Sequence, residues 1–167
     1  MGYYNKELDE INFKIIETCE QLKPYIYSYW VVKKDKIDTP MTQKILSDGC
    51  MGITINFKSA YAIKVNGNTQ NCIKNFIIDG PTKHPSYMLL EKELYLLGIR
   101  FKPAGAYVFF DENIDTFENK HITLKNNSTW QIDILYKKLI TTENLEDKIK
   151  LLEDFFMQKL KSNKKRS

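Results

Sequence analysis

The side chains in this sequence that could support catalysis or bind a metal are two histidines, three cysteines and scattered carboxylates. His84 and His121 are not spaced as metal ligands, and neither has a cysteine beside it in the sequence. The sequence contains no Gly-x-x-x-x-Gly-Lys phosphate loop, no Gly-x-Gly-x-x-Gly and no Gly-x-Ser-x-Gly turn. Asp48 has the chemistry of a general base, but Ser-Asp-Gly is first of all a turn sequence. We therefore expect no enzyme, no catalytic residue, no cofactor and no metal site.

Other residues have the character of a ligand pocket. Arg100 and Lys102 share one face of a predicted strand. A guanidinium buried inside a barrel would need an anionic partner, either a carboxylate such as Asp48 or Asp79, or an acidic ligand. The alternative is that this face meets solvent, because the opposite face of the strand is already apolar. Trp30 lies in a strand with aromatic residues on both faces, so it belongs either to the core or to a pocket wall.

The elements that must position these residues are strands in the first two-thirds of the chain. Alternation of apolar and polar residues, with β-branched and aromatic side chains, predicts the strands 25–33, 52–57, 61–65, 73–78, 88–90 and 94–101. Asn66 and Gly67 predict a tight hairpin turn. The stretch 35–43, which contains Pro40, is expected to be a turn.

The spacing of the apolar residues changes from the strand period to the helix period after Pro103, which ends the last predicted strand. Residues 104–110 predict a short helix, and Ser128 is placed to cap a helix whose apolar residues recur from Ile132 to Ile140. A second helix begins between 141 and 144 and forms an antiparallel hairpin with the first. The expected fold is α+β, a small antiparallel β-barrel followed by a C-terminal helical hairpin. The expected division is 1–125 for the β-rich part, 126–161 for the helical pair and 162–167 for a basic linker.

Composition narrows the class of protein. The chain has 167 residues, 25 basic and 21 acidic, and a net charge of +4, which is a mild excess. The clearest basic cluster, formed by Lys159, Lys161, Lys164, Lys165 and Arg166, is typical of a solvated tail more than of a DNA contact. Three widely spaced cysteines fit free thiols in a reducing cytosol. No signal peptide and no apolar run of about 20 residues is present, so we expect a cytoplasmic protein without a membrane segment.

Four segments resemble the N-terminal domain of one branch of AraC-type transcription regulators. Residues 22–30 resemble its opening strand, 45–57 its Leu-Pro-Asp-Gly turn and following strand, 78–82 its Gly-Pro corner, and 97–106 its Gly-Val-Arg-Phe-x-Pro-Gly element. Ser47 stands where the family usually has proline, and Ala104 precedes Gly105 where Pro-Gly is usual. These departures affect local turns.

The resemblance implies a cupin-like sensor domain that dimerises through helices. In full-length relatives, two helix-turn-helix units of about a hundred residues follow it and read the major groove. Nothing in this sequence is similar to those units, so DNA would be bound only through a C-terminal domain that is absent here. The partners implied are a second copy of the chain and a small-molecule effector. We expect the effector near Tyr27, Trp30, Asn56 and Arg100.

The second helix suggests the dimer surface. Its apolar residues are too many to fit against the first helix alone, which predicts an exposed dimerisation stripe of Leu145, Ile149, Leu152, Phe156 and Leu160. Two other classes remain open from the sequence. One is a stand-alone small-molecule-binding cupin-like protein, and the other is a cupin-like enzyme, against which the missing histidine cluster weighs.

Overall fold

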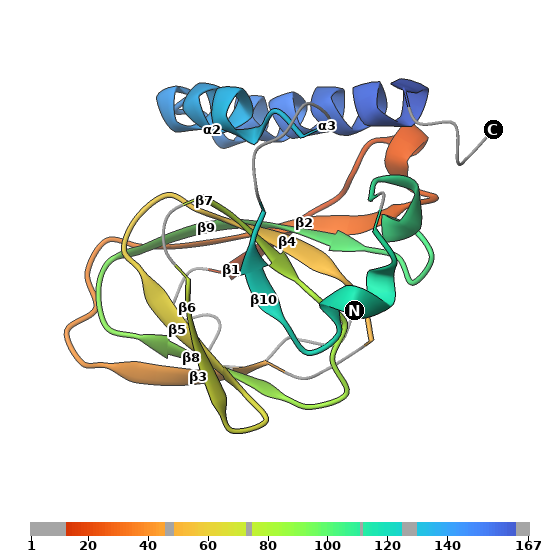
Figure 1. Ribbon diagram of the computed structural model, residues 1–167. Helices are drawn as coiled ribbons and strands as arrows, with labels where there is room; N and C mark the ends of the chain where they lie inside the picture. Colours follow the sequence, from red (N-terminus) through yellow and green to blue (C-terminus); the bar gives the residue numbers. More distant parts are fainter. Residues whose placement is uncertain (1–12, 46–48, 73–74, 111, 125–129, 163–167) are drawn as a thin grey trace.

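The residues that the structure describes form two facing antiparallel sheets and a layer of two helices (Figure 1). The computed structural model describes residues 13–45, 49–72, 75–110, 112–124 and 130–162. In this part of the chain the strand order is β1-β2-β9-β4-β7-β10 in one sheet and β3-β8-β5-β6 in the other. The strands are β1 (Phe13–Ile16), β2 (Ile26–Lys34), β3 (Met41–Ile45), β4 (Gly52–Asn56), β5 (Tyr61–Val65), β6 (Asn68–Cys72), β7 (Asn75–Asp79), β8 (Ser86–Leu90), β9 (Leu94–Phe101) and β10 (His121–Thr123).

In the described part of the chain the helices follow the strands in the sequence. They are α2 (Ile132–Thr141) and α3 (Leu145–Ser162), and short 3-10 turns occur at η1 (Glu20–Leu22), η2 (Ala106–Val108) and η3 (Ile114–Phe117). The α+β class, with antiparallel strands first and a helical hairpin after them, is therefore confirmed. Neither α2 nor α3 combines the length and apolar composition that a membrane-spanning helix requires.

The six-stranded sheet separates two apolar cores. Its strands alternate, so β9 directs Leu97 and Ile99 to one core and Leu96 to the other. The first core lies between this sheet and the helices, and the second lies between the two sheets. Figure 1 shows α2 and α3 on the side of the sheet that faces away from β3, β8, β5 and β6. A sheet covered on both faces explains why β9 is apolar almost throughout.

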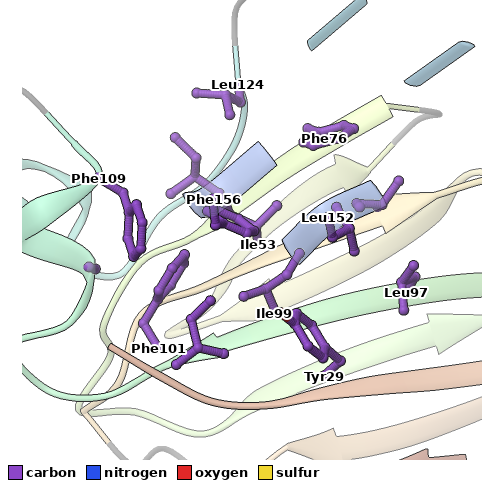
Figure 2. Packing of buried hydrophobic residues seen from close by; sticks show 14 of the residues in the cluster. Tyr29, Ile53, Phe76, Leu97, Ile99, Phe101, Phe109, Leu124, Leu152 and Phe156 are labelled. Atoms are coloured by element: carbon purple, nitrogen blue, oxygen red, sulfur yellow. The ribbon is translucent and has the colours of Figure 1, made fainter. Parts of the chain in front are cut away.

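The helix α3 is anchored to the sheet by its apolar face, as Figure 2 shows for Leu152 and Phe156. Phe156 is fully buried, with its ring centroid 5.9 Å from that of Phe101 and 5.1 Å from that of Phe109. The expectation of an exposed dimerisation stripe is thus wrong for Ile149, Leu152 and Phe156. They are buried inside one copy of the chain because the sheet, and not only the first helix, lies beneath α3.

The remaining predicted members of the stripe lie at the edge of that core. Leu145 and Leu160 are partly buried against it. Lys159 is also buried, with its ammonium 3.8 Å from the centroid of the Trp130 ring, so it does not belong to a solvated tail. The rest of that basic cluster from residue 163 onward lies outside the described residues, as do the predicted helix cap Ser128 and the predicted boundary at residue 125.

The hairpin turn at Asn66 and Gly67 is confirmed. Both residues have positive φ, 49° and 82°, as a tight turn between two twisted strands requires, and β5 pairs with β6 across it. The stretch 35–43 is only partly a turn, because Met41 begins β3. The predicted helix 104–110 is the single 3-10 turn η2. The edge strands β1 and β10 were not predicted.

Candidate functional site

A cavity of about 160 Å³ lies between the two sheets. Most of its wall is apolar, and polar side chains come from both sheets. The lining residues that matter for the chemistry are Trp30, Gly52, Thr54, Asp79, Leu96, Arg100 and His121 on the six-stranded side, and Gln43, Ile63 and Met88 on the four-stranded side. Apolar walls with a few placed polar groups are typical of small-molecule sites.

The strand register places the charged residues of the cavity in one row. Arg100 is the cross-strand partner of Gly52, Gly52 is that of Asp79, and Asp79 is that of His121. Directly opposite residues in an antiparallel ladder point to the same face of the sheet. Arg100, Asp79 and His121 therefore stand side by side on the inner face. Gly52 stands between Arg100 and Asp79 without a side chain, and a Cβ atom there would lie 2.8 Å from the backbone oxygen of Ile99.

Asp79 holds His121 in a fixed orientation. The imidazole Nδ1 lies 2.6 Å from Asp79 Oδ1, and the hydroxyl of Thr54 donates a hydrogen bond to the other carboxylate oxygen. The backbone N–H of His121 donates to Gln70 Oε1 at 2.7 Å. A carboxylate at Nδ1 keeps a proton on that nitrogen, so Nε2 accepts a hydrogen bond in the neutral ring and donates one in the protonated ring. This Nε2 is buried and has no hydrogen-bond partner in the described part of the chain.

Gln43 places a second unsatisfied acceptor at the cavity from the opposite sheet. The side chain is 2% exposed, and its Nε2 donates to the carbonyl of Lys44 at 3.0 Å. Its Oε1 is buried and accepts no hydrogen bond from any described residue. An unsatisfied buried polar group costs about 1–3 kcal/mol. Each of the two atoms has less than 1 Å² of accessible surface, so both are buried behind the wall of the cavity.

Trp30 forms an aromatic part of the wall and depends on Gly98. The ring of Phe13 stacks on the indole at a centroid distance of 6.2 Å. Gly98 of β9 lies directly across from Trp30 of β2. A Cβ atom added at Gly98 would lie 1.8 Å from the indole carbon Cε2 of Trp30. Gly98 therefore lets the indole lie against the backbone of β9, out of the cavity.

The Gly98→Ala substitution should push the indole of Trp30 out of place and reduce the cavity. We expect the free energy of unfolding to fall by about 1–3 kcal/mol, the usual cost of overpacking. Urea unfolding followed by circular dichroism measures the loss. Adding Trp30→Leu removes the clash, so the double variant should show a favourable coupling between the two sites. Strictly additive effects would contradict the assigned contact.

The predicted site residues are not all brought together. Trp30 and Arg100 lie in the cavity wall, so the face of β9 that carries Arg100 lines the interior. Tyr27 is partly exposed outside the cavity, and its ring centroid lies 4.7 Å from the guanidinium carbon of Arg100. A bulge between Ile26 and Ser28 in β2 allows this approach. Whether these residues bind a ligand stays a prediction.

Asn56 has a structural part and does not line the cavity. Its amide nitrogen donates to the carbonyl of Ser59 at 3.0 Å, and its oxygen accepts from the backbone N–H of Lys58 at 3.1 Å. These bonds close the loop that follows β4.

Asp48, the other carboxylate that the sequence offered as a partner of Arg100, lies outside the described residues. Asp79, one of the possible partners of Arg100, pairs with His121 and Thr54.

Sequence reasoning missed Gln43, Thr54 and His121. Gln43 lies midway between Met41 and Ile45, where an alternating strand would carry an inward-facing apolar residue. A polar residue at that position was the available signal. His121 had no local signal, because its partner Asp79 is 42 residues away.

Among the described residues, no group of three or more His, Cys, Asp or Glu is arranged to hold a metal ion. Burial raises the pKa of the Cys72 thiol to about 12, so this thiol is protonated at neutral pH.

The opposite face of the same sheet carries a polar link to α3. Glu153 Oε2 accepts hydrogen bonds from the backbone N–H of Cys19 at 2.6 Å, from the Thr18 hydroxyl at 3.2 Å and from the Tyr29 hydroxyl at 3.4 Å. Burial raises the pKa of Tyr29 well above its ordinary value, which keeps the phenol protonated as a donor. Tyr29 precedes Trp30 in β2, so neighbouring residues of one strand contact α3 and the cavity.

Solved structures similar to this chain share little sequence with it. The cupin-2 domain of an XRE-family transcriptional regulator from Enterobacter cloacae is 9% identical, with a TM-score of 0.43, over 55% of this chain and 95% of that one. A cupin-2 domain protein from Shewanella frigidimarina is 10% identical, with a TM-score of 0.40, over 55% and 80%. A protein from Thermotoga maritima described as a predicted oxalate decarboxylase is 10% identical, with a TM-score of 0.41, over 53% and 77%.

A comparison with curated proteins finds no match. One protein family matches the sequence, and its description is "Domain of unknown function (DUF6597)". The match extends over residues 14–123, from β1 to the end of β10, and so includes every strand that lines the cavity. This chain therefore belongs to the DUF6597 family.

Proposed function

We propose that this chain is the ligand-sensing and dimerisation domain of an AraC-type transcription regulator, which controls DNA binding by a C-terminal double helix-turn-helix domain. The observation that carries the sensing part is the cavity between the sheets, with its apolar wall and the polar residues Gln43, Thr54 and His121 that line it. The four sequence segments that resemble AraC-type regulators support the regulatory part.

The arrangement of layers offers a route for the signal. The six-stranded sheet forms the wall of the cavity on one face and the floor of the helical layer on the other. A ligand that contacts Trp30 acts on the same strand that Tyr29 ties to Glu153 of α3. A ligand that prefers one of two helix positions would shift the population toward it and so bias the attached DNA-binding units.

Dimerisation is part of the proposal and does not use the buried residues of α3. A partner copy would contact the outer side of the helical layer, where Ile134 and Ile140 of α2 are 54% and 48% exposed. Leu145 and Leu160 are partly buried at the edge of the core. The proposal also places the protein in the cytoplasm, where DNA is accessible.

The test of the regulatory part is to sequence the native gene beyond codon 167. An open reading frame that continues for about a hundred codons with two helix-turn-helix patterns supports a regulator. A frame that stops near Ser167 would contradict it and favour a stand-alone small-molecule-binding protein. The fragment alone should bind no DNA sequence tightly in fluorescence anisotropy, and tight sequence-dependent binding would also contradict the proposal.

A further inference from the structure

Much of the wall of the cavity between the sheets is apolar. Phe13 and Trp30 line it from the six-stranded sheet, and Ile45 and Met88 line it from the four-stranded sheet. All four belong to the core between the sheets or pack against it, and all four keep accessible surface. A molecule that enters the cavity exchanges water for contacts with these side chains, which is favourable in proportion to the apolar area that it buries.

The polar side chains behind this wall are bonded to one another or buried. Thr54 donates a hydrogen bond to one oxygen of Asp79, and His121 Nδ1 lies 2.6 Å from the other. The amide nitrogen of Gln43 donates to the carbonyl of Lys44. The remaining hydrogen-bonding atoms of these side chains, Gln43 Oε1 and His121 Nε2, have less than 1 Å² of accessible surface. A polar ligand would lose hydrogen bonds to water and gain few in return.

The cationic side chains at the cavity do not provide an anion site inside it. Lys44 alternates with the inward-facing Gln43 in β3, so its side chain is exposed on the outer face of the sheet. The guanidinium of Arg100 is engaged with the ring of Tyr27, which lies outside the cavity, and with Cys50 Sγ at 4.0 Å. A ligand that carries a charge would therefore be desolvated without a compensating partner.

The volume limits the ligand to a single small ring. The cavity measures about 160 Å³, close to the engineered apolar cavity of about 150 Å³ that binds benzene. A six-membered ring with one small substituent fits this space, and a fused pair of rings exceeds it.

The side chains of the wall favour an aromatic ring over a saturated one. The rings of Phe13 and Trp30 stack at a centroid distance of 6.2 Å, so an aromatic guest can extend this pair by stacked or edge-on contacts. Met88 faces them from the opposite sheet, and a thioether sulfur makes favourable contacts with aromatic rings.

We infer that the cavity binds an uncharged monocyclic aromatic compound of low polarity, held by apolar contacts with Phe13, Trp30 and Met88. This inference rests on the proposed small-molecule-binding function and assigns its ligand class. A carboxylate or a hydroxyl group added to the same ring weakens binding, because the wall does not replace the water that the group loses.

The experiment compares probes that share a six-membered ring with one one-carbon substituent. Toluene, benzyl alcohol and benzoate are titrated into the chain by isothermal titration calorimetry. Toluene is expected to bind at least about 10-fold more tightly than benzoate and about 3-fold more tightly than benzyl alcohol, because the polar groups must be desolvated. Benzoate or benzyl alcohol that binds as tightly as toluene would overturn the low-polarity class.

A saturated analogue tests the aromatic part. Toluene and methylcyclohexane are compared by their partition from the vapour into solutions with and without the protein. Toluene is expected to bind at least about 3-fold more tightly, since the saturated ring lacks the quadrupole that the rings of the wall contact. Equal affinity of the two hydrocarbons would overturn the preference for an aromatic ring.

Opposite changes at Met88 test the placement of the ligand. Met88→Trp fills the cavity and should weaken toluene binding at least about 10-fold. Met88→Ala enlarges the cavity and should raise the affinity for naphthalene relative to toluene at least about 10-fold, which the fluorescence of naphthalene follows. Met88→Ala adds no volume, so it tests the placement independently of whether Met88→Trp folds.

The matched controls are Leu89→Trp and Leu89→Ala. Leu89 is the next residue of β8, and its side chain points to the outer face of the same sheet. Both controls should leave the affinities for toluene and naphthalene within about 2-fold of the unchanged chain. Variants of Leu89 that alter toluene binding as much as those of Met88 would overturn the placement.

The outcomes separate this inference from the proposed function. Binding of benzoate or another polar compound in preference to toluene, with loss of binding in Met88→Trp, would overturn the ligand class and leave a small-molecule site between the sheets. Failure of every class of small molecule to bind would overturn both the inference and the proposed sensing function.

Discussion

Replacing Phe156 with alanine is expected to lower the free energy of unfolding by about 3–5 kcal/mol. Its ring is fully buried between α3 and the six-stranded sheet, where it contacts Phe101 and Phe109 edge-on (Figure 2). It also contacts Trp130 edge-on. Truncation removes these contacts and leaves a cavity that a rigid sheet cannot fill by collapsing. Chemical denaturation of the purified chain, followed by circular dichroism, gives the change directly.

The matched control is Ile134→Ala on α2, whose side chain is 54% exposed and should change stability by less than about 0.5 kcal/mol. The loss caused by Phe156→Ala should not depend on protein concentration, because the residue packs within one copy of the chain. A loss that disappears at high protein concentration would show instead that α3 forms the dimer interface.

Replacing Glu153 with alanine is expected to cost about 1–3 kcal/mol, although the residue is only partly buried. One carboxylate oxygen accepts from the Cys19 backbone N–H and from the hydroxyls of Thr18 and Tyr29. Alanine leaves the Cys19 N–H and one of the two hydroxyls without their acceptor beneath α3, since Thr18 and Tyr29 also share a hydrogen bond of 3.0 Å with each other. The same variant should loosen the attachment of α3 to β2, which hydrogen exchange of the α3 amides measures as faster exchange.

Two variants bracket this result. Glu153→Gln keeps an oxygen acceptor at the same place and should lose less stability than alanine. Asp154→Ala changes the neighbouring exposed carboxylate and should be nearly neutral. Equal stability of Glu153→Ala and Asp154→Ala would mean that the polar link between β2 and α3 contributes nothing.

Much of the fold could be predicted because most strands follow the period of two. The strand 94–101 was predicted with the bounds that β9 has, and the Asn66–Gly67 turn fixes the neighbouring hairpin. The strand β3 was missed because its inward-facing residue is Gln43, so the usual apolar signal is interrupted where the site needs a polar group. The stripe on α3 was assigned correctly as apolar but to the wrong partner, since sequence periodicity does not say which surface covers a helix.

The candidate site could be predicted only in part. Trp30 and Arg100 were recognisable because an aromatic and a cation stood out in strands with apolar surroundings. The pairing of Asp79 with His121 depends on the cross-strand register of β7 and β10, which no local pattern reveals. Asn56 was chosen by residue type alone, and its hydrogen bonds close a loop.

The most direct measurement is thermal unfolding of the chain with a panel of small aromatic hydrocarbons, carboxylates, polyols and amino compounds, recorded in parallel for Gly98→Ala. We predict at least one compound that raises the melting temperature by about 5–10 °C at 100 times its dissociation constant, which corresponds to about 2.7 kcal/mol. We also predict that the shift is lost in Gly98→Ala, because the displaced indole of Trp30 fills the cavity. An unchanged shift in that variant, or no shift with any compound, would contradict a ligand site between the sheets.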